Sequence, residues 1–256
     1  MSNKLIYTIV LGYFFLLLIA PLLSTHDPRQ TNTANIASTP TTEHWLGTDQ
    51  LGRDVYSRLL HGGQRTVSIA GLALAIATIP ALLLGIFSQL APRWAGECLK
   101  ILLNTLLAFP ALLMALIVLT TLGRGFTQIA IATGIAQMPY MLQVICETLS
   151  QQTARPHILA AQSLGATQWH ILYKHILPHA LPVIVAYVAT TFSYCIINSA
   201  ALSLLGLGSD PSIPEWGTML ASGRAIYRVA PLTALAPAVA ITLTVILTNK
   251  LSNTIR

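Results

Sequence analysis

The chain has 256 residues, of which 54% are hydrophobic and only 9% are charged. Soluble domains carry about a quarter charged residues, so this composition excludes an ordinary soluble protein and indicates an integral membrane protein. The formal net charge is +6, but the 14 Lys and Arg residues lie singly and form no basic patch, so we expect no nucleic acid partner. Cys98, Cys146 and Cys195 lie far apart among apolar residues and indicate neither a disulfide framework nor a zinc site.

The first apolar segment, 5–24, has no charged residue over about 20 positions, enough to cross a hydrocarbon core about 30 Å thick. A cleaved signal peptide is the alternative, because Lys4 precedes the segment. The segment is long for a signal and no small-x-small cleavage site follows, so we expect a retained first helix. Five further apolar segments lie at 66–90, 98–122, 125–146, 180–207 and 230–249.

These segments predict an all-α integral membrane protein with about six transmembrane helices in a single domain, 1–256. Inside lipid the backbone satisfies its own hydrogen bonds only in helices or closed barrels, and segments of about 20 residues or more favour helices. We expect kinks at Pro80, Pro110 and Pro139.

Three polar loops separate the segments, at 26–65, 150–179 and 208–229. With six spans and both termini in the cytoplasm, the first and third loops are external and the second is cytoplasmic. The positive-inside rule does not choose this orientation, because the 14 Lys and Arg residues divide seven to seven between the two sides.

The loop 150–179 has a helix, glycine, helix pattern. A short helix is interrupted at Gly165, and an apolar stripe resumes with Trp169, Leu172 and Ile176 at spacings of three and four. Pro178 is expected to stop this second helix just before the next span. Periodicity alone fits a connector that lies on the membrane surface as well as an element that docks a soluble partner.

The same loop resembles the Glu-Ala-Ala loop of bacterial ABC importer permeases. Residues that match the family pattern in type and spacing are Ala160, Ala161, Gly165, Leu177 and Pro178. Leu159 stands where the family has glutamate. The resemblance implies a coupling helix that sits in a groove of a cytoplasmic ATPase, with the coupling residues Leu159, Ala160, Ala161, Gly165, Ala166, Trp169, Leu177 and Pro178.

Two other segments, 44–65 and 203–219, are similar to external loops of the second, C-type permease subunit of oligopeptide, dipeptide and nickel importers. In the first segment, Asp49 with Arg53 and Asp54 with Arg58 have the i, i+4 spacing of a helix face. Most of these charged residues are expected to form a solvated loop without ligand contacts.

The resemblance implies a type I ABC importer permease fold in the bacterial plasma (inner) membrane, with both termini cytoplasmic. The chain would form half of a translocation pathway for short peptides or for nickel or a metal chelate. The implied partners are a second permease subunit, two ATPase subunits that bind ATP and Mg²⁺, an extracytoplasmic solute-binding protein and membrane lipid. No lysine follows a glycine as in a phosphate-binding loop, so we expect no cofactor and no catalytic site on this chain.

Polar residues inside spans are costly unless they face the bundle interior or a water-filled path. The pathway candidates are Asn104, Gln128, Gln137, Tyr194 and Asn198, with interhelical hydrogen bonding as the alternative. No metal site is expected, because Pro178 separates His175 from His179. Transient contact with a metal complex is the alternative for His26, His44 and His61, which share one external loop, but their wide spacing argues against it.

A different class of function, an ion-coupled carrier or a membrane-embedded enzyme, would need an intramembrane carboxylate or a histidine cluster. Glu147, at the end of the fourth predicted span, is the only candidate that the sequence offers, and it stands alone.

Overall fold

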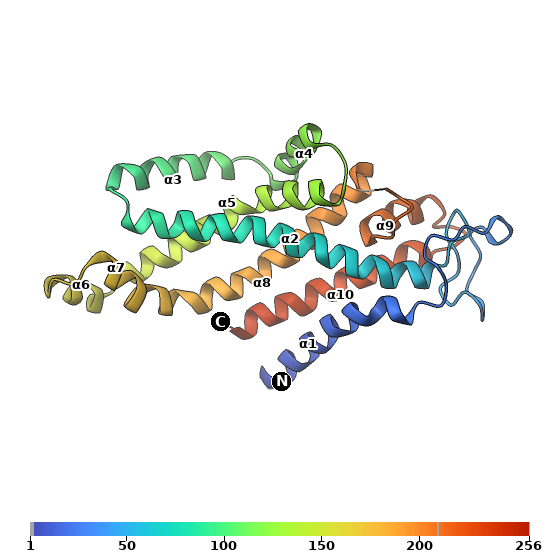
Figure 1. Cartoon of the computed structure of the whole chain (residues 1–256), viewed down its shortest axis with the longest axis horizontal. Helices are drawn as coiled ribbons and strands as arrows, with labels where there is room; N and C mark the ends of the chain where they lie inside the picture. The colour runs from blue at the N-terminus through green and yellow to red at the C-terminus, as the bar shows by residue number, and fades with distance from the viewer. Residues whose placement is uncertain (1–2, 209, 256) are drawn as a thin grey trace.

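The computed structural model describes residues 3–208 and 210–255, which fold into helices joined by loops (Figure 1). The α-helices are α1 (Asn3–Ile19), α2 (Val55–Leu90), α3 (Arg93–Leu107), α4 (Ala111–Leu122), α5 (Phe126–Thr153), α6 (Pro156–Ser163), α7 (Gln168–Ile171), α8 (Leu177–Leu202), α9 (Trp216–Ala225) and α10 (Leu232–Ile255). The shorter segments are the 3₁₀ helices η1 (Ala20–Leu23) and η2 (Thr33–Asn35) and the π-helices η3 (Leu172–Ile176) and η4 (Ser203–Leu207).

Five helical stretches in the described chain are long and apolar enough to cross a membrane, or six if the bent pair α3 and α4 forms one span. This agrees with the prediction of about six. The predicted third span, 98–122, is broken where a kink at Pro110 was expected, and the break is sharper than a kink, because α3 and α4 meet at an angle of 89°. At 12 residues, α4 is about 18 Å long and does not cross a bilayer by itself.

Proline acts differently at the positions where kinks were predicted. The sharp bend occurs at Pro110, which immediately precedes α4. Helices α2 and α5 continue without a break through Pro80 and Pro139. A proline ring clashes with the carbonyl four residues earlier but need not end a helix whose neighbours hold it in place.

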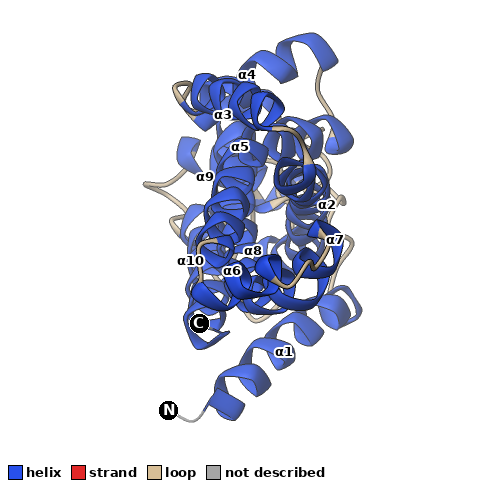
Figure 2. Ribbon diagram, turned by 90° about the vertical axis from the view of Figure 1, so that its left-hand side faces the viewer, coloured by secondary structure: helices blue, strands red, loops and turns tan. Residues whose placement is uncertain are grey.

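The bundle is elongated, with α2 packed along α5, and α8 packed against both α5 and α10. The α2–α5 contact is close because glycines lie in it. A Cβ on Gly134 would lie 2.8 Å from the Ala73 carbonyl oxygen, and one on Gly85 would clash with Ile145. Figure 2 shows α1 on the side of the bundle opposite α3 and α4.

The two ends of the bundle differ. Two loops from distant parts of the chain gather at one end, and we call their residues, 24–54 and 210–215, the cap (Figure 1). The α6–α7 pair lies at the opposite end. The described chain therefore places the two loops implied to be external at one end and the loop implied to be cytoplasmic at the other.

Candidate functional site

The cap is held by a buried cluster of one carboxylate and two guanidinium groups. Nε of Arg53 donates a 2.7 Å hydrogen bond to Oδ2 of Asp49, and Nε of Arg58 lies 3.5 Å from the same oxygen. The three residues are at most 5% exposed. The prediction of a solvated loop is therefore wrong for these side chains, because the loop folds over them.

The same guanidinium groups join the two loops of the cap. Arg58 donates to the carbonyl oxygens of Pro28 at 2.9 Å, Pro211 at 3.1 Å and Ser212 at 3.2 Å. Arg53 donates to the Pro211 carbonyl at 3.2 Å. These charge-assisted bonds of two buried cations hold the loops of the cap together over the start of α2.

Asp54 has a partner other than the one its spacing predicts. Its side chain accepts a 2.8 Å hydrogen bond from the Ser57 backbone N–H and so caps the N-terminus of α2. Its second oxygen lies 2.9 Å from Nδ1 of His44. Arg58 bonds elsewhere, so of the two predicted i, i+4 pairs only Asp49 with Arg53 forms.

Beneath the cap, α9 is a short helix inserted against α2. The indole N–H of Trp216 donates to the Leu59 carbonyl at 2.9 Å, and the Trp216 backbone N–H donates to Oγ1 of Thr66 at 3.1 Å. Glu215 is fully buried and accepts a 2.5 Å hydrogen bond from Oγ of Ser203. Sequence reasoning missed this carboxylate, because Glu215 falls in a stretch with the composition of a polar loop. Glu147, the carboxylate that the sequence singled out, is exposed.

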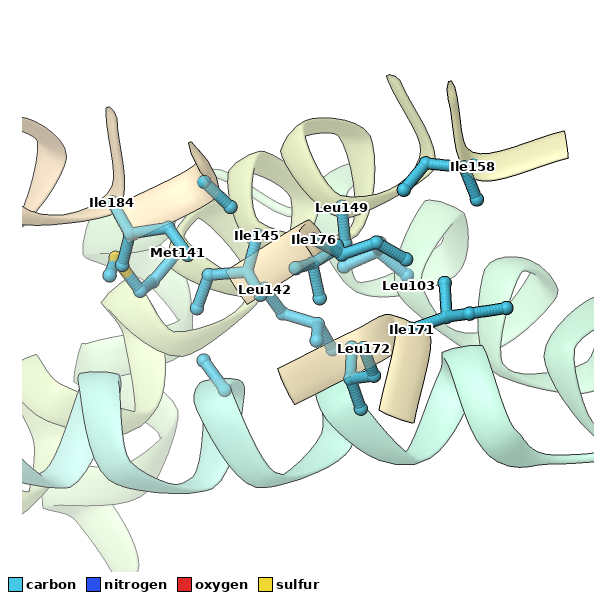
Figure 3. Close-up of a cluster of buried hydrophobic side chains, with 12 residues drawn as sticks. Leu103, Met141, Leu142, Ile145, Leu149, Ile158, Ile171, Leu172, Ile176 and Ile184 are labelled. Atoms are coloured by element: carbon cyan, nitrogen blue, oxygen red, sulfur yellow. The ribbon is translucent and has the colours of Figure 1, made fainter. Parts of the chain in front are cut away.

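At the other end, the α6–α7 pair is fastened to the bundle by apolar side chains. Ile158 of α6 and Ile171 of α7 are buried, together with Leu172 and Ile176 of the π-helix that follows. They pack against α5 residues such as Leu149 (Figure 3). A buried Ile or Leu side chain contributes about 2 kcal/mol, so this cluster fixes the pair relative to α5 and α8.

Gly165 turns the chain between α6 and α7. Its φ is +84°, and the Ala166 N–H donates to the Ala161 carbonyl at 3.1 Å, the 6→1 bond of a Schellman motif. Thr167 then caps α7, with its side chain accepting from the His170 N–H at 3.3 Å. The predicted interruption at Gly165 is confirmed, and its cause is the left-handed conformation that glycine adopts without strain.

The outward surface of the pair carries large apolar side chains. Leu164 is 89% exposed, Trp169 66% and Tyr173 77%. The predicted stripe is confirmed for Leu172 and Ile176, which are buried, and is wrong for Trp169, because Ile171 takes the buried position instead. Of the predicted coupling residues, Ala160, Gly165 and Pro178 are also exposed, while Ala161, Ala166 and Leu177 are half-buried; the side chain of Leu159 lies outside the described part.

Pro178 does not stop the helix as predicted. The chain is helical from Gln168 to Leu207, and Pro178 lies in the first turn of α8. The Leu177 N–H bonds back to the Leu172 carbonyl, which is the wider π pattern. That wider turn accommodates a residue without an N–H donor.

The structure separates the predicted pathway residues. Gln137 is 4% exposed and lies within the packed part of α5. Asn104 lies exposed on α3, and Gln128 lies half-buried in the first turn of α5. Tyr194 and Asn198 are one turn apart on α8, where Tyr194 is 48% exposed.

Near the cap, a cavity of about 690 Å³ opens between η4, α9 and the start of α10. Its lining includes the side chains of Arg224, Tyr227 and Arg228, with apolar residues such as Leu204 and Leu220. Arg224 and Arg228 are both exposed. The cavity is therefore lined by two cationic side chains together with apolar residues.

A helical bundle with several candidate membrane spans, a hydrogen-bonded cap at one end and an anchored helix pair at the other is the architecture of a multi-pass membrane protein. The chain belongs to the family of binding-protein-dependent transport system inner membrane components, which matches residues 81–256. It is thus a permease subunit of an ABC importer and a multi-pass inner membrane protein. Such subunits are not catalytic, and separate ATPase subunits hydrolyse ATP.

Named relatives cover most of the chain. The dipeptide transport system permease protein DppC of Alkalihalophilus pseudofirmus is 31% identical over 97% of this chain and 82% of its own length. The glutathione transport system permease protein GsiD of Salmonella typhimurium is 37% identical over 85% of this chain and 72% of its own length. The di/tripeptide transport system permease protein DppC of Pseudomonas aeruginosa is 32% identical over 96% and 85%.

Solved structures share the fold. An amino acid ABC transporter superposes with a TM-score of 0.60 at 20% identity, covering 77% of this chain and 92% of its own. The inward-facing MetNI methionine ABC transporter superposes with a TM-score of 0.61 at 16% identity, covering 78% of this chain and 96% of its own. These confirm the type I permease fold.

Proposed function

We propose that this chain is the C-type permease subunit of an importer for short peptides, glutathione-like tripeptides included. The observation that carries the proposal is the set of relatives, 31 to 37% identical over most of the chain, that are named for dipeptides, di/tripeptides and glutathione. None of these three is named for nickel, so the peptide alternative is preferred over nickel or a metal chelate.

The α6–α7 pair is the proposed docking element for an ATPase subunit. Two features support this: the pair is fixed to α5 and α8 by buried residues such as Ile158 and Ile171, and it exposes Leu164, Trp169 and Tyr173 away from them. A helix pair that is fixed to α5 and α8 on one face and binds a partner through apolar side chains on the other face would transmit the partner's movement to α5 and α8. Exposed apolar groups of this size are typical of protein interfaces.

The cap is proposed to face the extracytoplasmic side and to meet the solute-binding protein, which leaves both termini in the cytoplasm. The support is that the family resemblance of 44–65 and 203–219 falls on the cap end of the bundle, while the resemblance to the coupling loop falls on the α6–α7 end. The second permease subunit would complete the pathway, with Tyr194 and Asn198 of α8 as its proposed lining on this chain.

The cavity beside α9 supports a peptide substrate. Arg224 and Arg228 can pair with a carboxylate, and every short peptide carries one at its C-terminus. The apolar lining beneath tolerates varied side chains. We propose that a peptide passes this cavity as it leaves the binding protein.

Competition in uptake tests the substrate proposal. Proteoliposomes that contain the complete importer should take up a labelled dipeptide with ATP inside, and unlabelled di- and tripeptides should compete. Competition by a nickel chelate alone, without competition by peptides, would contradict the proposal.

A further inference from the structure

Three residues of the cap converge although the sequence separates them. One potential ligand atom of each of His26, Glu43 and His44 lies within 4.8 Å of those of the other two. In the part of the chain that the structure describes, this is the one group of three or more His, Cys, Asp or Glu residues with that geometry. His26 follows the first span and the other two belong to the loop that folds back over it, so only the tertiary structure brings them together.

The histidines are held by their surroundings. Nδ1 of His44 lies 2.9 Å from Oδ1 of Asp54, which is itself buried and fixed as the cap of α2. With Nδ1–H donating to this carboxylate, Nε2 of His44 keeps its lone pair for a metal. A carboxylate behind a histidine is the usual outer-shell partner of a metal ligand and fixes both tautomer and ring orientation.

His26 is also positioned. Its backbone N–H donates to Oγ of Ser57 at 3.1 Å, and its carbonyl accepts from Oγ of Ser24 at 2.6 Å. Its ring lies 4.8 Å from that of His44, centroid to centroid, and its Nδ1 is 4.0 Å from Oδ2 of Asp54. A half-buried imidazole and a buried one are thus set side by side in the cap, with the exposed Glu43 beside them.

We propose that His26, His44 and Glu43 form a zinc site on the cap. Two imidazoles and one carboxylate are ligands that Zn²⁺ prefers, and three protein ligands leave the fourth tetrahedral position to water. The ion would tie the chain that leaves the first span to the loop above α2 and so stiffen the cap. The site is separate from the cavity near Arg224 and does not depend on which solute is transported.

Zinc titration of the intact importer, purified with a tag that contains no histidine, tests this proposal. Binding is measured by competition with a chromophoric chelator. We expect one Zn²⁺ per permease chain and at least a tenfold loss of affinity in each of His26→Gln, His44→Gln and Glu43→Gln. Glu43 is exposed, so its substitution leaves packing intact and keeps the test valid if a histidine variant folds poorly.

The matched control is His61→Gln, because His61 lies on α2 near the cap but outside the cluster, and it should keep full affinity. Four further histidines gather at the opposite end, where the rings of His157, His170, His175 and His179 lie 5.9 to 6.5 Å apart in pairs. Zinc affinity that is unchanged in all three cap variants, or that is lost on replacing these four histidines instead, would overturn the proposal. Failure of the wild-type importer to bind Zn²⁺ would overturn it as well.

Discussion

Nε of Arg53 donates a 2.7 Å hydrogen bond to Oδ2 of Asp49, and both side chains are buried where the cap meets α2. Asp49→Asn leaves the guanidinium groups of Arg53 and Arg58 buried without the carboxylate between them. Breaking a buried ion pair costs about 3 kcal/mol, so we expect a clear drop in the melting temperature of the purified subunit in detergent. Asp27→Asn, at an exposed position in the same cap, is the control and should melt as the wild type does.

Gly165 is predicted to tolerate only residues that adopt a positive φ. Gly165→Val places a β-branched side chain at φ +84° and costs about 1–3 kcal/mol of local strain, which would distort the turn between α6 and α7. Asparagine enters this conformation more readily, so Gly165→Asn should be milder. Co-purification of ATPase subunits and ATP hydrolysis stimulated by the binding protein are the measurements.

The control for that series is Gly71→Ala on α2, where φ is not positive and a Cβ would meet open space. The Gly71→Ala variant should co-purify with the ATPase subunits and show stimulated ATP hydrolysis as the wild type does. Equal coupling in Gly165→Val and the wild type would show that the turn is not needed for docking.

Trp169 and Ile171 are two residues apart and should behave in opposite ways. Trp169→Ala removes an exposed side chain, so the subunit should keep its melting temperature but lose most of its bound ATPase. Ile171→Ala removes a buried side chain and should destabilise the subunit by about 2–5 kcal/mol. If Trp169→Ala retains the ATPase at wild-type levels, the outward face of the α6–α7 pair is not the interface.

Topology can be tested with single cysteines in a variant that lacks Cys98, Cys146 and Cys195. Thr39→Cys and Ser212→Cys are exposed positions in the cap and should react with an impermeant thiol reagent added to intact cells. Gln168→Cys, exposed on α7, should react only after lysis. The reverse pattern would place the cap in the cytoplasm.

Arg224 and Arg228 are predicted to act on substrate entry. Arg224→Gln and Arg228→Gln each remove one cation from the cavity and should raise the KM for peptide uptake several-fold with little change in the maximal rate, because each would weaken an exposed pairing with a carboxylate. Arg124→Gln, exposed in the loop between α4 and α5, is the control. Unchanged KM values in both cavity variants would show that the peptide does not contact the arginines of this cavity.

The spans were predictable because apolar length is a local property. Segment 5–24 and the apolar parts of α2, α5, α8 and α10 follow from hydropathy alone. The start of α2 at Val55 did not, since its first turns carry Arg58 and other polar residues that the cap buries. The right-angle bend before α4 was expected only as a kink, because Pro110 signals a break but not its angle.

The coupling turn was predictable and the cap was not. The glycine at position 165 indicates a turn in the sequence itself, because few other residues adopt a positive φ. The buried Asp49 cluster, the buried Glu215 and the convergence of His26 with Glu43 and His44 all depend on loops folding over one another. No pattern along the chain encodes those contacts, although the i, i+4 spacing did pair Asp49 correctly with Arg53.

The most direct test of the account is ATP-dependent uptake of a labelled dipeptide into proteoliposomes that contain this chain, the second permease subunit and the ATPases, with binding protein outside. The account predicts uptake that requires all of these components and ATP inside, and that falls to background when this chain carries Gly165→Val. Uptake by this chain alone, driven by an ion gradient without ATP, would contradict it and favour an ion-coupled carrier.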